Sequence, residues 1–432
     1  MRTKIPAAAM SLLVPGWLAA QNATKCDADN GGIKVPAGFC VVVFADSVAG
    51  ARQLVVAPNG DVIASSRAGV VVLRDANGDG RADSRSAYAT GFRSTHVALS
   101  GKYLYVEMAP TGRGSGSATT TIVRYAYKPG DEKPSSASDT IVEGIPRTGE
   151  HTSRNFAISR DGALYVNFGS ASNACQTKEG AKGSPGVNPC PELETRAGIW
   201  RFDARKAHQT QAKGEHFARG IRNAVGITMD PTGTKLWTTQ HGRDQLGGAM
   251  GLWDFDAKYS ADNPAEELMQ VNRGDDFGWP YCYYSNEEKK LVLAPEYGGD
   301  GKKVGQCAGK KSPVAAFPGH WAPNALVVYT GSMFPAKYKN GAFIAFHGSW
   351  NRAPEPQAGF NVTFQPLDLA TAKATGSYQV FADGFWANPT TGRASAQAGA
   401  RRPTGLAQGP DGALYVSDDA GGRIWKIVYT GR

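Results

Sequence analysis

The chain has 432 residues, of which 41% are hydrophobic and 20% are charged. This balance excludes a disordered protein and provides enough apolar side chains for a sizeable core. The formal net charge is +9, but the lysines and arginines are scattered rather than gathered in one basic run. The charge therefore gives little support to a nucleic-acid partner and is better suited to local arginines that hold an anionic ligand.

The first 20 residues have the features of a secretory signal peptide. Arg2 and Lys4 form a basic start, and the apolar run that follows is too short to span a bilayer. A buried N-terminal strand is the alternative, which the prolines in the run disfavour. We predict a signal peptide over 1–20, a mature chain over 21–432 with no membrane span, and a secreted or periplasmic location.

Six cysteines follow this segment. Their order suggests the pairs Cys26–Cys40, Cys175–Cys190 and Cys282–Cys307, although six cysteines allow fifteen pairings and the sequence does not choose among them. A metal-thiolate site is the alternative, but no C-x-x-C pair occurs. An oxidising compartment is therefore favoured.

A short module of strand, polar glycine turn and strand recurs along the chain. The segment FCVVVFA (39–45) is a first β-branched strand, and six copies of the module then begin near residues 54, 97, 156, 225, 325 and 406. Such self-similarity predicts an all-β, six-bladed β-propeller in a single domain, with the spare strand at 39–45 completing the last blade. A two-sheet sandwich is the structural alternative.

The copies are unevenly spaced, which indicates long insertions at one rim. The largest insertion falls near 250–320 and contains Cys282 and Cys307. Within it, a short helix is predicted over 263–271, with Asn263 as the cap and Pro264 at the first helical position.

Histidine and arginine side chains precede the same strand in five copies. They are Arg93 with His96, His151, Arg222 with Asn223, His320, and Arg402. This position faces the axial channel of a propeller, so these side chains should converge. A histidine there can take a proton near neutral pH, and we predict His151, with Glu150 beside it as an orienting group. Converging arginines without matching acids require an anion; independent, solvated loop charges are the alternative.

Two segments suggest a hard cation such as Ca²⁺. The first is QHGRDQL (240–246), with Asp244 and the carbonyls that flank a glycine. The second is DANGDGRAD (75–83), which offers the alternate oxygen ligands Asp75, Asn77, Asp79 and Asp83. A bidentate glutamate is missing at the twelfth position, where Ser86 stands, and an ordinary Asp/Gly turn is the alternative.

As a set, several segments resemble the soluble quinoprotein glucose and sorbosone dehydrogenases over about residues 50–430. They are EHTSRNFAISRDGALYV, GIRNAVGI, QHGRD, NRGDDFGWPYC, HWAPNAL, FHGSWNR and RPTGLAQGPDGALYVSDD. The resemblance, nearest to the sorbosone and pyranose branch, implies a six-bladed propeller that uses pyrroloquinoline quinone (PQQ) and Ca²⁺. The substrate would be a sugar or sugar aldehyde, and the electrons would pass to an external acceptor such as a cytochrome or a dye.

The resemblance also implies roles for individual residues. His151 would be the base, Arg222 would stabilise negative charge on the quinone oxygen, and Asn223 would hydrogen-bond the same edge. The carbonyls of Gly242 and Arg243 would hold Ca²⁺. Arg402 would pair a PQQ carboxylate, and Arg93 and His320 are further candidate cofactor contacts.

This chain departs from the glucose enzymes at four of their site positions, and their early-loop glutamine has no clear match in GFRSTH. It has Asn351 in place of a lysine, Thr404 in place of an arginine and Ser170 in place of an acid. Arg352 stands next to Asn351, and both are candidate cofactor contacts; Arg401 stands three residues before Thr404. A calcium-dependent propeller lactonase and a non-catalytic carbohydrate-binding propeller are the functional alternatives, and the oligomeric state is not predicted.

Overall fold

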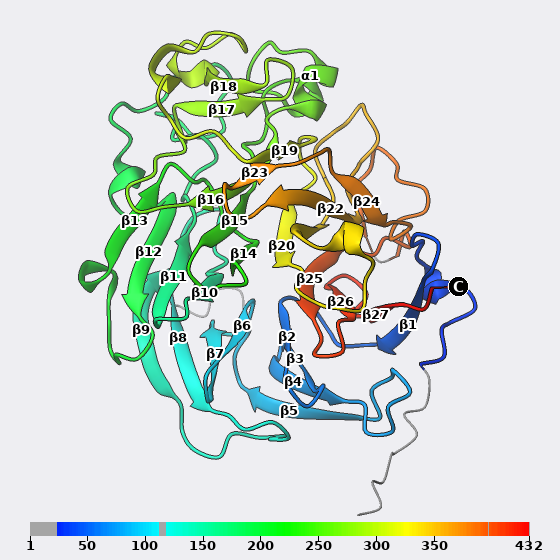
Figure 1. Cartoon of the computed structure of the whole chain (residues 1–432). Helices are drawn as coiled ribbons and strands as arrows, with labels where there is room; N and C mark the ends of the chain where they lie inside the picture. The colour runs from blue at the N-terminus through cyan, green and yellow to red at the C-terminus, as the bar shows by residue number, and fades with distance from the viewer. Residues whose placement is uncertain (1–23, 112–117, 396, 432) are drawn as a thin grey trace, which may run out of the picture.

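The computed structural model describes residues 24–111, 118–395 and 397–431. The predicted signal peptide over 1–20 lies outside these residues. The described strands form an all-β, six-bladed propeller, as predicted, with the blades arranged around a central opening (Figure 1). No helix in the described residues combines the length and the apolar character that a membrane crossing needs.

The first three blades are meanders of four antiparallel strands in chain order. Blade 1 contains β2 (Leu54–Val56), β3 (Val62–Ser66), β4 (Gly69–Arg74) and β5 (Ser84–Thr90). Blade 2 contains β6 (Val97–Ser100), β7 (Tyr103–Met108), β8 (Thr119–Ala126) and β9 (Asp139–Pro146). Blade 3 contains β10 (Phe156–Ile158), β11 (Ala163–Phe168), β12 (Gly198–Asp203) and β13 (Glu215–Arg219).

The last three blades depart from this simple meander. Blade 4 contains β14 (Ile227–Met229), β15 (Leu236–Gln240), β16 (Glu266–Val271) and β19 (Ala315–Phe317). Blade 5 contains β20 (Pro323–Val328), β21 (Gly341–Phe346) and β22 (Asn361–Asp368), with β23 (Lys373–Ala374) and β24 (Gln379–Ala382) both paired to β22. Blade 6 contains β25 (Pro403–Gln408), β26 (Leu414–Asp418), β27 (Ile424–Tyr429) and β1 (Phe39–Ala45).

The strand β1 closes the ring, as predicted. It pairs antiparallel with β27, from Phe39 opposite Tyr429 to Ala45 opposite Ile424. Figure 1 shows the two strands side by side at the ends of the colour scale. The pairing removes the open sheet edge that blade 6 would otherwise present.

The core lies between neighbouring blades, because one blade cannot bury both of its faces alone. Between blades 2 and 3, Ile122 and Ile141 pack in one buried cluster with Phe168 and Trp200. Phe168 is fully buried, and its ring centroid lies 4.8 Å from that of Trp200. Each blade therefore depends on its neighbours for burial of its apolar side chains.

The insertion in blade 4 packs as a unit on one rim (Figure 1). It includes the helix α1 (Ala257–Asp262) and the hairpin of β17 (Cys282–Ser285) and β18 (Lys290–Leu293). The Tyr259 hydroxyl of α1 lies 2.7 Å from that of Tyr283 in β17. The three disulfides join the pairs suggested by the sequence, including Cys282–Cys307 within this insertion.

The helix predicted over 263–271 is wrong. The helical turn lies just before it, where Asp256 caps α1 by accepting a hydrogen bond from the Tyr259 N–H. Asn263 is the C-cap, and the segment Glu266–Val271 is the buried strand β16, paired on both sides. Helix-favouring residues in this segment are overridden by its position in the middle of a sheet.

The described residues also contain short 3₁₀ turns. These are η1 (Asn30–Gly32), η2 (Pro191–Glu194), η3 (Gln211–Lys213), η4 (Gly248–Met250), η5 (Pro295–Tyr297), η6 (Gly305–Cys307) and η7 (Ala336–Tyr338).

Candidate active site

The hairpin of each blade brings two loops to the same end of the propeller. The innermost strand begins at this end, and the second strand, which runs antiparallel to it, finishes there. The loop before the innermost strand and the loop after the second strand are therefore adjacent. In blade 4, for example, the His241 N–H donates to the Asn223 carbonyl at 3.1 Å, where His241 follows β15 and Asn223 precedes β14. We call this end of the propeller the site end.

His151, just before β10, is held by Ser170, which follows β11. Its Nδ1 lies 2.9 Å from both the carbonyl oxygen and the Oγ of Ser170. The Ser170 hydroxyl donates its own hydrogen to the carbonyl of Ser172 at 2.6 Å, so both Ser170 oxygens can only accept from the imidazole. Nδ1 therefore carries the proton, and the Nε2 lone pair is available as a base.

The surroundings of His151 favour its neutral form. Burial lowers the pKa of His151 well below its usual value, and the positive charge of Arg222 lowers it further. The hydrogen bond with Ser170 and the charge of Asp244 raise this pKa but do not offset the decrease. Glu150, which was expected to orient the imidazole, makes no hydrogen bond to it; within the described residues, Ser170 has that role. The expectation for Glu150 is corrected accordingly.

Asn223 lies beside His151 because Gly169 leaves room between them. A Cβ at Gly169 would lie 2.6 Å from the His151 Cβ and 3.0 Å from the Asn223 Oδ1. That oxygen also accepts a hydrogen bond from Asn167 Nδ2 at 3.0 Å. The structure therefore brings the predicted base and Asn223 together across blades 3 and 4.

Arg222 is the centre of a buried polar cluster. Its Nη2 donates to Asp244 Oδ2 at 2.8 Å and to Asn173 Oδ1 at 3.0 Å, and its Nη1 donates to the Gly242 carbonyl at 2.9 Å. Burial alone would raise the pKa of Asp244, but the Arg222 charge and a hydrogen bond with His320 hold it well below its usual value. The expectation that these arginines lack matching acids is therefore wrong, since Arg222 is paired with Asp244.

Two more predicted residues contact Asp244. Its Oδ1 accepts a hydrogen bond from Asn351 Nδ2 at 2.7 Å and lies 3.4 Å from His320 Nδ1. The guanidinium of Arg352 instead donates to the carbonyl of Gly319 at 3.1 Å, so it supports the loop that leads to His320. We use the name Arg222 cluster for Arg222, Asp244, Asn173, His320 and Asn351.

Arg402 belongs to a second cluster, where blades 5, 6 and 1 meet. Its Nε donates to the His347 carbonyl at 2.9 Å and its Nη2 to the Gly348 carbonyl, while the described residues provide no acceptor for Nη1. Asp419 lies 2.8 Å from His347 Nε2 and accepts from Arg52 Nη1 at 2.6 Å. We use the name Arg402 cluster for Arg402, His347, Asp419 and Arg52.

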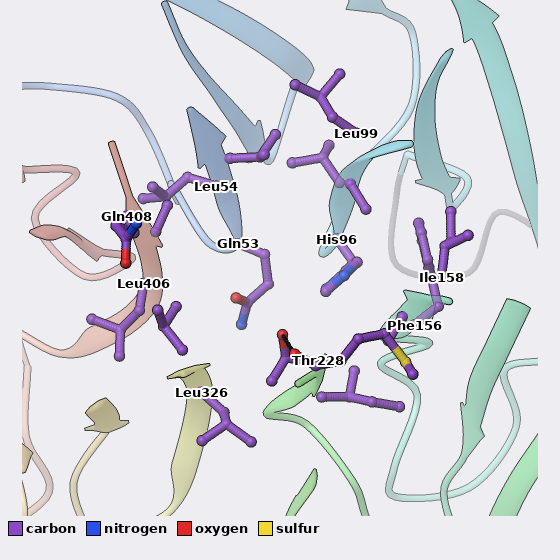
Figure 2. A pocket seen from close by; sticks show the side chains of 18 of the residues that line it. Gln53, Leu54, His96, Leu99, Phe156, Ile158, Thr228, Leu326, Leu406 and Gln408 are labelled. Carbon is purple, nitrogen blue, oxygen red and sulfur yellow. Dashed lines mark hydrogen bonds between the residues drawn. The ribbon is translucent and has the colours of Figure 1, made fainter. Parts of the chain in front are cut away.

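The segment before β6 contributes a histidine to the channel rather than an arginine to either cluster. Arg93 is exposed and, among the described residues, makes no side-chain hydrogen bond. His96 is buried, and Figure 2 shows it near Gln53 and Thr228 around the central channel. This cavity has a volume of about 290 Å³ and is lined by the innermost strands.

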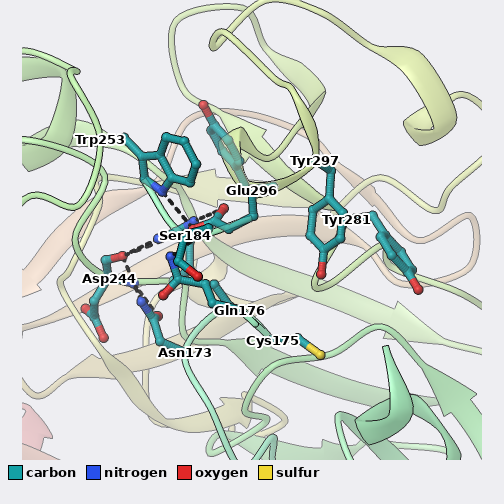
Figure 3. Close-up of polar contacts among 12 residues, drawn as sticks. Asn173, Cys175, Gln176, Ser184, Asp244, Trp253, Tyr281, Glu296 and Tyr297 are labelled. Carbon is teal, nitrogen blue, oxygen red and sulfur yellow. Dashed lines mark hydrogen bonds and ion pairs between the residues drawn. The ribbon is translucent and has the colours of Figure 1, made fainter. Parts of the chain in front are cut away.

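The loop proposed to hold Ca²⁺ is anchored on both sides. The Gly242 N–H donates to Glu266 Oε2 at 3.0 Å, and the Gly242 carbonyl accepts one hydrogen bond. Arg243 forms a buried ion pair with Glu296, which also accepts from Trp253 Nε1 at 2.9 Å (Figure 3). The insertion thus fixes this loop at the site end, and the role of the Gly242 and Arg243 carbonyls as metal ligands stays a prediction.

The other predicted calcium loop joins β4 to β5 at the opposite end of the propeller. Its carboxylates are used within the turn: Asp75 Oδ1 accepts from the Gly78 N–H at 2.8 Å, and Asn77 Nδ2 donates to Asp79 at 3.3 Å and to Asp83 at 3.1 Å. In the part of the chain that the structure describes, no group of three or more His, Cys, Asp or Glu side chains is placed to hold a metal ion. A second Ca²⁺ site here stays a prediction without structural support.

Several residues of the site were not predicted from the sequence. They follow the second strand of a blade, whereas the predicted residues precede the innermost strand. His241, His347 and Asp419 stand in this position in blades 4, 5 and 6. The sequence contained a signal, since His-Gly follows the second strand at both histidines. Asn173 has no such signal, because it lies in a long loop outside the repeated module.

The chain matches a protein-family model and several curated proteins. The family model described as TrAA12-like matches residues 33–430. An uncharacterized protein from Borreliella burgdorferi is 29% identical over 218 residues, which are 50% of this chain and 49% of that protein. The pyrroloquinoline quinone-dependent pyranose dehydrogenase of Coprinopsis cinerea is 29% identical over 239 residues, which are 50% of this chain and 31% of that enzyme. The chain thus spans about half or less of the length of these relatives.

Solved structures share the fold over most of the chain. The holo form of the pyranose dehydrogenase PQQ domain from Coprinopsis cinerea has a TM-score of 0.72 at 21% identity, covering 92% of this chain and 97% of that one. A calcium structure of family AA12 from Trichoderma reesei has a TM-score of 0.72 at 18% identity, with coverage of 92% and 97%. The resemblance drawn from the sequence motifs is confirmed. Because the family model matches nearly the whole chain, this protein belongs to the TrAA12-like family.

Proposed function

We propose that this chain is a PQQ-dependent dehydrogenase that oxidises a sugar or sugar aldehyde of the sorbosone, aldose or pyranose class. The observation that carries the proposal is the state of His151, with a proton held on Nδ1 by Ser170 and a free lone pair on Nε2. The positive charge of Arg222 acts on the same imidazole. The pyranose dehydrogenase relative is named as PQQ-dependent, which supports the same cofactor here.

Groups at the site end fit PQQ, a quinone with three carboxylates. Within the described residues, Arg402 Nη1 has no protein acceptor, and the buried Nε of Arg52 has no partner. The buried Oδ1 of Asn351 is also without a hydrogen bond. Guanidinium N–H groups are preferred partners for carboxylates, so a bound carboxylate would satisfy the free N–H groups of Arg402 and Arg52. The Asn351 Oδ1 is an acceptor and would instead need an N–H or O–H donor or a cation.

The reaction needs a base, a stabilising charge and an acceptor. His151 removes the proton of the substrate hydroxyl through Nε2, and the two Ser170 oxygens stabilise the imidazolium that forms. Arg222 would stabilise the negative charge that develops on the quinone oxygen, and Asn223 would hydrogen-bond the same edge of the quinone. PQQ, when bound, supplies the acceptor for the hydride of the substrate.

The remaining parts of the proposal concern the metal, the electron acceptor and the location. We assign Ca²⁺ to the carbonyls of Gly242 and Arg243, where the Gly242 oxygen has a second lone pair besides the one used by Arg222. Electrons leave to an external acceptor, a cytochrome or a dye. The three disulfides support a secreted or periplasmic location.

The test is to add PQQ and CaCl₂ to the purified protein and to follow dye reduction with aldoses, pyranoses and sorbosone. His151→Ala should lower the rate by about 10²–10⁴-fold, whereas His208→Ala should not change it, because His208 is exposed and remote from the site. Lactone hydrolysis without PQQ, or saturable sugar binding without dye reduction, would overturn the proposal.

A further inference from the structure

One short segment lies between the proposed base and the proposed stabilising arginine. Ser170 contacts the imidazole of His151, and Asn173, three residues later, contacts the guanidinium of Arg222. The Ser170 N–H also donates to the carbonyl of Arg222 at 2.8 Å. We call Ser170–Asn173 the bridge segment, because it contacts both groups.

Asn173 is buried, and every polar group of its side chain is used at the site. Its Oδ1 accepts from Arg222 Nη2 at 3.0 Å and from the Asp244 N–H at 2.8 Å, while its Nδ2 donates to the Asp244 carbonyl at 3.0 Å. Its own carbonyl accepts from Arg222 Nε at 3.3 Å and from Trp279 Nε1 at 3.0 Å. Figure 3 shows Asn173 directed toward Asp244.

The bridge segment is itself held by two carboxylates, Glu179 inside the loop that the disulfide Cys175–Cys190 closes and Glu192 in η2 just after it. Glu192 accepts from the Ala171 N–H at 2.6 Å, and Glu179 accepts from the Asn173 N–H at 2.9 Å. The backbone of Asn173 is therefore anchored by contacts that do not involve Arg222.

We propose that Asn173 is a positioning residue that holds the guanidinium of Arg222 at a fixed position relative to the imidazole of His151. In this way Asn173 sets the affinity for PQQ. This inference rests on the proposed function. Besides Asn173, Arg222 binds Asp244 through Nη2 and the Gly242 carbonyl through Nη1, and neither of these contacts holds its Nε. The amide oxygen and the carbonyl of Asn173 bind two different nitrogens of Arg222, which leaves one orientation.

The first experiment measures PQQ binding to the cofactor-free protein by tryptophan fluorescence, a readout that does not require turnover. Asn173→Ala should weaken PQQ binding about tenfold, because it removes a hydrogen bond to a charged group. In the loaded enzyme it should lower kcat about a hundredfold and leave the KM for the sugar within about twofold, as expected for misplacement of a group that acts in the reaction.

Gln176→Ala is the matched control. Gln176 is a buried amide in the same loop, but its side chain bonds only within the loop, to Ser184, Ala181 and Gly180 (Figure 3). It should bind PQQ as the wild type does. If Asn173→Ala does not fold by circular dichroism, Asn173→Ser takes its place.

A double-mutant cycle separates positioning from a general structural effect. If Asn173 acts through Arg222, Asn173→Ala should have little further effect on PQQ binding in the Arg222→Lys background. Wild-type affinity in a folded Asn173 variant, or equal losses in both backgrounds, would overturn this role alone. Failure of the wild type itself to bind PQQ would overturn the proposed function and this role with it.

Discussion

Replacing Ser170 with Asp should raise the pKa of His151 and move the acid limb of the pH–rate profile upward. In the wild type, burial and Arg222 hold that pKa well below its usual value, so kcat/KM should stay level as the pH falls through 6.5. A carboxylate roughly 4 Å from the imidazole contributes about 4 kcal/mol at an effective dielectric constant of about 20. Since one pH unit corresponds to about 1.4 kcal/mol, the shift should be about 2 to 3 units after salt screening.

The assay is the pH dependence of kcat/KM, combined with ¹H–¹⁵N spectra of the imidazoles in the cofactor-free protein. The spectra should show a neutral His151 protonated on Nδ1 in the wild type. Ser170→Ala should change the profile little, because the carbonyl of residue 170 still accepts from Nδ1. An acid limb near pH 6.5 in the wild type, or one that Ser170→Asp leaves unchanged, would refute the argument.

Three further outcomes follow from buried groups. Burial raises the pKa of Glu267 from 4.5 to about 8, so the wild type loses stability as the pH rises between these values, where Glu267 ionises more readily in the unfolded chain. Relative to the wild type, Glu267→Gln should therefore gain about 1.4 kcal/mol per pH unit in that window, measured by urea unfolding. A difference that does not change with pH would contradict this. Removing the Cys282–Cys307 disulfide, which spans 25 residues, should lower the free energy of unfolding by about 3 kcal/mol in the same assay. An unchanged urea midpoint would contradict this stabilising role. Gly169→Ala should abolish most turnover in a folded protein, whereas Gly376→Ala, with no atom nearer than 3.9 Å to the added Cβ, should keep it; equal activities would remove the steric argument.

The repeated hairpins made the fold predictable from the sequence. Alternating apolar strands with Asn-Gly and Asp-Gly turns define the blades locally, and the spare strand at 39–45 had one place left to pair. The helix predicted over 263–271 failed because the decisive contacts of that segment are with β15 and β19, which are remote in sequence.

The site was predictable only where its residues belong to the repeat. His151, Arg222 and Asn223 occupy repeated positions and do meet at one end of the propeller. The acid that pairs with Arg222 was not recognised as its partner, because Asp244 reaches it from a different strand. Asn173 lies in a loop whose path depends on a disulfide, so no local pattern reports its position.

The pairing of β1 with β27 also constrains how the molecule can assemble. Phe39 and Tyr429 are direct partners although almost the entire chain separates them. During synthesis, blade 6 therefore cannot be completed until β27 has left the ribosome. Until then, β1 has no partner strand. The cost in entropy of bringing such distant segments together predicts slow folding, with ring closure as a late step.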